Sequence, residues 1–186
     1  MDEQEYLDQY ERRLQDSLVS LCTAYEMMGG TLLENDDIDS KFTEELAQPY
    51  LTDAVREYRA FPEAAVAWAG YMGMAIAKLW VADWQTCRDV AYTDLLGFRG
   101  FDDMDERIVE KVLGYELDGE QARRIADILS NCAVEALTMI RHEHIEPQSP
   151  RAYYVFARTV QVLYRIGASI ELFLLGYKNQ GIYLSL

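Results

Sequence analysis

Apolar residues recur at intervals of three and four along the first thirty positions of the chain. This spacing places them on one face of an amphipathic α-helix. Gly29 and Gly30 are predicted to end the helix, because glycine adopts left-handed backbone geometry at little cost. Residues 31–40 then form a polar, acidic connection. The apolar positions of this helix are Tyr6, Leu7, Tyr10, Leu14, Leu18, Leu21, Cys22, Tyr25 and Met28.

The same periodicity predicts further helices along the rest of the chain. A second helix begins near Asp39 or Ser40 and is bent or broken at Pro49. A third begins at Pro62 and continues to about Asp89. The later segments are a short piece over 90–97, a turn at 97–100, a helix capped by Asp103, a helix from Asp118 to about His144, and a last helix from Ser149-Pro150 to about Leu175.

No segment has the alternating pattern of a strand bounded by hairpin turns. The sequence therefore predicts an all-α protein, with residues 1–186 forming a single helical domain. Because most connections are short, we expect an antiparallel helical bundle of about six or seven helices.

The third predicted helix contains a fourteen-residue stretch, 64–77, without a charged residue, which Lys78 interrupts. A membrane-spanning helix needs about 20 apolar residues, so this segment is predicted to be a core helix and no membrane association is expected. Glycine in the middle of a helix costs about 1 kcal/mol relative to alanine. Gly70 and Gly73 therefore indicate that either a neighbouring helix or a ligand approaches this backbone closely, with Lys78 or Tyr71 as a polar contact for a ligand.

The formal net charge is −15, and residues 1–63 hold sixteen acidic and five basic residues. This charge disfavours direct binding to nucleic acid or to anionic membranes. It favours a protein partner with a basic surface, although acidic residues also simply maintain solubility. The predicted acidic interaction surface consists of Glu34, Asp36, Asp37, Asp39, Glu44 and Glu45.

Arg151, Arg158 and Arg165 are seven residues apart, so they lie on nearly one line along the last helix. Two interpretations remain open for this row. Guanidinium groups bind carboxylate and phosphate well, which would make the row an anion site. Alternatively, the three arginines form ion pairs with the acidic first third of the chain.

No metal or cofactor is predicted. His142 and His144 point in different directions on a helix, and the three cysteines form no CxxC pair. The Asn35-Asp37-Asp39 pattern resembles the start of a calcium loop but lacks its later ligands. Buried thiols and the acidic N-terminus favour a cytoplasmic protein without disulfides.

No catalytic motif is present, so we expect a non-enzymatic protein–protein interaction or regulatory module. One alternative is a small-molecule binding protein or enzyme with a pocket beside Gly70 and Gly73. Another is an acidic inhibitor or immunity-type protein that targets a basic partner. The apolar tail Ile182–Leu186 would be costly to expose, so it is predicted to pack on the domain or to join a partner chain in a homo-oligomer.

Overall fold

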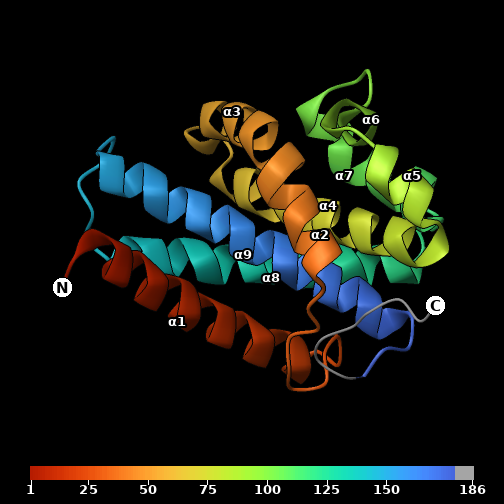
Figure 1. Ribbon diagram of the computed structural model, residues 1–186, viewed down its shortest axis with the longest axis horizontal. Helices are drawn as coiled ribbons and strands as arrows, with labels where there is room; N and C mark the ends of the chain where they lie inside the picture. Colours follow the sequence, from red (N-terminus) through yellow and green to blue (C-terminus); the bar gives the residue numbers. More distant parts are fainter. Residues whose placement is uncertain (179–186) are drawn as a thin grey trace.

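The computed structural model describes residues 1–178, and every regular element in that range is helical. The all-α prediction is therefore confirmed. Figure 1 shows how the long and the short helices are arranged. The long helices are α1 (Glu3–Ala24), α3 (Ala47–Tyr58), α4 (Pro62–Ala82), α8 (Glu120–His142) and α9 (Pro150–Leu174). The short helices are α2 (Asp36–Lys41), α5 (Trp84–Asp89), α6 (Tyr92–Leu96) and α7 (Met104–Arg107). The predicted role of the tail Ile182–Leu186 lies outside the described residues.

Several helix ends follow from local sequence chemistry. The Ser149 hydroxyl accepts a hydrogen bond from the Ala152 amide at 3.1 Å, and Pro150 occupies the first turn of α9. Asn35 caps α2 in the same way, by accepting from the Ile38 amide. Each cap satisfies a backbone donor that has no partner inside its helix.

The predicted third helix over 62–89 is wrong in one respect, because it is broken at Asp83. This residue has extended backbone geometry (φ −163°, ψ 106°), and its carboxylate accepts from the Gln85 amide and the Thr86 hydroxyl. These bonds offer the chain an alternative to continuing α4, so α5 begins as a separate helix.

Pro49 does not break its helix as predicted. A π-helical turn, Phe42–Leu46, precedes α3 and places Pro49 within the first turn of that helix. The helical stretch 36–58 is continuous, and the π-helical turn is the irregularity that lies next to a residue unable to donate a backbone hydrogen bond.

Two predicted caps are also wrong. The Asp103 side chain makes no capping bond, because a 3-10 turn (Phe101–Asp103) leads directly into α7 and a second π-helical segment (Ile108–Leu113) follows α7. At the start of α8 the cap is Gly119 rather than Asp118.

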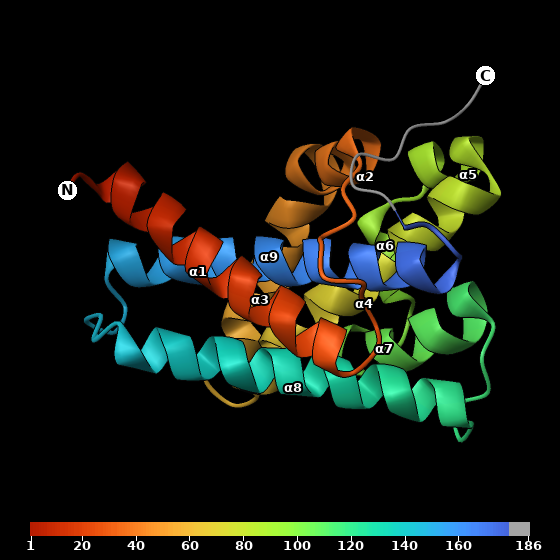
Figure 2. The same cartoon turned by 90° about the horizontal axis from the view of Figure 1, so that it is seen from below.

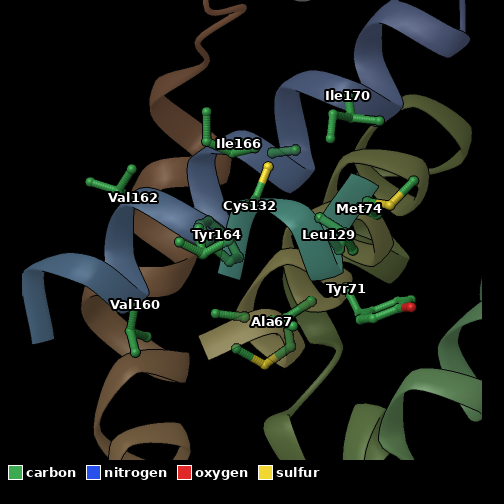
Figure 3. Packing of buried hydrophobic residues seen from close by; sticks show 14 of the residues in the cluster. Ala67, Tyr71, Met74, Leu129, Cys132, Val160, Val162, Tyr164, Ile166 and Ile170 are labelled. Atoms are coloured by element: carbon green, nitrogen blue, oxygen red, sulfur yellow. The ribbon is translucent and has the colours of Figure 1, made fainter. Parts of the chain in front are cut away.

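Helix α4 lies at the centre of the molecule and packs most extensively against α9. Figure 2 shows α1 crossing beside α8 and α9 on one side. Met74 of α4, Leu129 of α8 and Ile166 of α9 belong to one buried cluster (Figure 3). By length and composition α4 could cross a membrane, but 72% of its apolar window is buried within the protein.

Candidate binding groove

A groove of about 970 Å³ lies where the C-terminal ends of α3 and α8 meet the start of α9. In Figure 1 this is the end of the molecule at which the α8–α9 connection lies. Pockets of roughly 300–1,000 Å³ are typical of ligand sites. The groove is lined by Val55, Arg56, Tyr58, Arg59, Ile140, Arg141, His144, Ile145, Pro147, Gln148, Ser149, Ala152, Tyr153 and Phe156.

The polar part of this lining is basic. Arg56, Arg59, Arg141 and His144 are all exposed, and no Asp or Glu is among the described residues that line the groove. None of the four makes an ion pair with a described residue, and the net charge of the chain is −15. The groove therefore presents uncompensated positive charge on an acidic protein.

The rest of the lining is largely apolar and aromatic. Tyr58 and Phe156 pack edge to face, with ring centroids 5.0 Å apart. Burial raises the pKa of Tyr58, while the nearby Arg141 charge lowers it. Tyr153 and Val55 each remain 47% exposed. Aromatic and apolar side chains with a few polar groups are the usual composition of a binding site.

One wall of the groove has an unusual backbone. His144 (φ 52°) and Gln148 (φ 63°) both adopt left-handed geometry, which costs a residue with a side chain about 1–2 kcal/mol. Such residues persist where the surrounding structure imposes the shape, and they cluster at ligand sites. The connection 143–149 is thus held in a defined shape at the edge of the groove.

The arginine row of α9 forms ion pairs, largely with α1. Arg151 donates to Glu3 at 3.0 Å, and Arg158 donates to Asp8 at 3.0 Å and to Glu11. Arg165 donates to Glu11 at 2.7 Å. Carboxylates of the same chain therefore already occupy the guanidinium groups that an external anion would need.

The glycine positions of α4 contact helix α9 and helix α8. A Cβ added at Gly73 would lie 1.9 Å from the Tyr164 carbonyl oxygen, and one added at Gly167 would lie 1.9 Å from the Gly70 carbonyl oxygen. A Cβ at Gly70 would meet Leu129. The ligand pocket predicted beside Gly70 and Gly73 is thus filled by protein, because the glycines allow two helix backbones to touch.

Lys78 and the predicted acidic surface are only partly available to partners. Burial raises the pKa of Glu171 to about 7, and the charge of the half-buried Lys78 acts in the opposite direction. Within the acidic surface, at least three of the six carboxylates face groups of this chain: Asp37 accepts from Trp80 at 3.1 Å, Asp39 lies 3.8 Å from Arg165, and Glu45 pairs with Lys41. Asp36 and Glu44 are exposed.

Sequence reasoning did not single out the groove arginines or Tyr153. The available signal was a pair of basic clusters, Arg56 with Arg59 and Arg141 with His142, each at the end of a predicted helix. Basic residues are common there because they interact favourably with the helix dipole. Only the packing of the helices shows that the two ends meet.

Among residues 1–178, no group of three His, Cys, Asp or Glu side chains could hold a metal ion. No protein-family model matches this sequence. Neither a curated protein nor a solved structure is significantly similar to it.

Proposed function

We propose that this protein is a non-enzymatic binding module that recognises a partner protein through the groove between α3, α8 and α9. The segment recognised has an apolar side chain flanked by acidic residues. The observation that carries this proposal is a groove lined by three arginines and a histidine, with no described carboxylate, in a chain of net charge −15. Complementary charge at the rim of a site gives specificity and fast association.

We further propose that the helices form an antiparallel bundle of about six or seven, which keeps the groove walls in place. The protein acts in the cytoplasm, which the free, buried Cys22, Cys87 and Cys132 support.

Two short peptides test the groove in NMR titrations of the isotope-labelled full chain. The first has a phenylalanine between glutamates, and the second has a phenylalanine between lysines. We expect the acidic peptide to shift resonances of the groove residues at low salt. Arg141→Glu should weaken its binding about ten-fold, equivalent to about 1.4 kcal/mol.

The matched control is Arg123→Glu, the same charge change at an exposed position near the other end of α8. It should leave binding of the acidic peptide within about two-fold, because Arg123 lies roughly 27 Å along α8 from Arg141. Equal weakening by both variants, or no groove shifts at all, contradicts the proposal.

A basic partner surface is a second proposal, supported by the exposed Asp36 and Glu44 at the predicted acidic surface. In this case the lysine peptide shifts resonances over residues 34–45. If replacing both carboxylates by lysine leaves that binding unchanged at low salt, this second proposal is wrong.

A further inference from the structure

A second hollow, of about 580 Å³, lies over the first half of α4, between α7 and α8. It shares no lining residue with the groove between α3, α8 and α9. Three aromatic side chains, Phe61, Trp68 and Tyr71, line this aromatic hollow. Its volume lies within the range of roughly 300–1,000 Å³ that is usual for small-molecule sites.

Trp68 and Tyr71 form one corner of the aromatic hollow. Their ring centroids are 5.5 Å apart, and their ring planes meet at 89°. The Trp68 indole nitrogen donates to the Phe101 carbonyl at 2.8 Å, which fixes the orientation of the indole ring. Phe61, just before α4, is 60% exposed. Aromatic rings at different angles around one space are the arrangement that binds quaternary ammonium groups.

The charged side chains that line the aromatic hollow are both acidic. They are Glu63 and Asp105, and no Lys, Arg or His is among the described residues of the lining. Neither carboxylate belongs to an ion pair between described residues, although Glu63 accepts a hydrogen bond from Ser130. The hollow therefore presents uncompensated negative charge beside aromatic rings.

The charges that act on the interior of the hollow are also negative. Burial, together with the charges of Glu106 and Asp103, raises the pKa of Asp105 to about 6, although backbone amides act in the opposite direction. Burial and the charges of Asp105 and Asp127 likewise raise the pKa of Tyr71. A cation bound here would favour the ionised form of Asp105 and offset the cost of burying its charge.

The Tyr71 hydroxyl is a polar group that the chain leaves unpaired. Tyr71 is only 4% exposed, yet its hydroxyl makes no hydrogen bond with a described residue. The equally buried Tyr50 and Tyr164 donate to the carbonyls of Ala65 and Ile38. In Figure 3 the Tyr71 oxygen points away from the other labelled core side chains. A polar group of a ligand in the hollow can therefore satisfy this hydroxyl.

We propose that the aromatic hollow binds a quaternary ammonium group, such as that of choline, between its aromatic rings and its two carboxylates. This site is independent of the groove. A metal ion is the less suitable ligand, because no group of three His, Cys, Asp or Glu side chains within residues 1–178 could hold one. A weakly hydrated organic cation, by contrast, gains from contact with aromatic faces.

NMR titration of the isotope-labelled full chain tests the proposal with two molecules of the same shape. Choline carries the positive charge, and 3,3-dimethylbutan-1-ol has a neutral carbon in place of the nitrogen. Choline chloride replaces sodium chloride, so that the ionic strength stays constant. We expect choline to shift the Trp68 indole resonance and the amide resonances of residues 61–71. It should bind about ten-fold more tightly than the neutral alcohol.

Asp105→Asn removes one charge and keeps the shape of the side chain. It should weaken choline binding about five-fold and leave binding of the neutral alcohol unchanged. Trp68→Leu should weaken binding of both molecules, because it removes the aromatic corner. Asp16→Asn is the matched control, at an exposed position of α1. It should leave choline binding within about two-fold, because salt screens the charge of a residue outside the hollow.

A neutral peptide with one trimethyllysine presents the same cation on a protein chain. Tighter binding of choline than of this peptide identifies a free molecule as the ligand, and the reverse identifies a modified protein; both outcomes support the ammonium site. The proposal is overturned if choline shifts none of these resonances, or if the neutral alcohol binds as tightly as choline. Equal effects of Asp105→Asn and Asp16→Asn, with both variants folded by circular dichroism, also overturn it.

Discussion

Glu171 places a carboxyl group inside the core of the protein. Only 1% of its surface is exposed, and its Oε2 has no hydrogen-bond partner among the described residues. Burial raises its pKa to about 7, although the Lys78 charge acts in the opposite direction. The ordinary value for a glutamate is about 4.3, so the folded protein holds this proton more tightly than the unfolded chain.

This difference makes stability depend on pH in a defined direction. Between the two pKa values the folded state keeps the proton and the unfolded state has lost it. The free energy of unfolding therefore falls as pH rises through that interval and becomes constant above the folded pKa. The stabilising contribution is complete below about pH 4 and is lost by about pH 8.

Glu171→Gln should stabilise the protein at pH 8 by about 2–3 kcal/mol, because it removes the cost of a buried charge. The difference from the wild type should shrink toward zero below about pH 4, where Glu171 is protonated in both the folded and the unfolded chain. Urea unfolding at a series of pH values measures both quantities.

Glu116→Gln, at an exposed position, should change stability by less than about 0.5 kcal/mol at either pH. A Glu171→Gln variant that is less stable than the wild type at pH 8 would show that the carboxylate is stabilised by a partner.

The pairing of α4 and α9 depends on glycine at the element scale. The backbones touch at Gly73 with Tyr164 and at Gly70 with Gly167. This contact fixes how deeply α9 lies against the central helix, and α9 also supplies one wall of the groove.

Gly73→Ala should destabilise the protein by about 3 kcal/mol or more, because the new Cβ would overlap the Tyr164 backbone and α9 would have to move. Gly70→Ala should cost less, since its Cβ meets the flexible Leu129 side chain. Thermal and urea unfolding of the purified variants provide the measurement.

Gly29→Ala is the matched control, because its Cβ would make an ordinary contact 3.6 Å from Phe173. It should be neutral or slightly stabilising, since alanine restricts the unfolded chain. If Gly73→Ala is no worse than Gly29→Ala, the close approach of α4 and α9 is not required for stability.

At the scale of the whole molecule, the groove differs in charge from the chain to which it belongs. Its described lining holds three arginines and no carboxylate, whereas the net charge of the chain is −15. The net charge of the chain predicts a partner with a basic surface. The charged side chains that line the groove instead favour an acidic partner. A partner responds mainly to the charges close to its binding site, because physiological salt screens a charge over about 8–10 Å.

The sequence by itself determined the helical class, most helix positions and several helix ends. Apolar periodicity and the capping chemistry of Ser149 act over a few residues, so they are visible without the fold. The seven-residue spacing of Arg151, Arg158 and Arg165 likewise showed that they share one face.

Only the tertiary structure decided what each face meets. It placed α9 on Gly73, paired Arg158 with Glu11, and brought Arg56 and Arg141 to one groove. These contacts join residues far apart in the chain, and their geometry depends on how whole helices pack rather than on local sequence. For that reason the candidate site was invisible in the sequence while the helices around it were not.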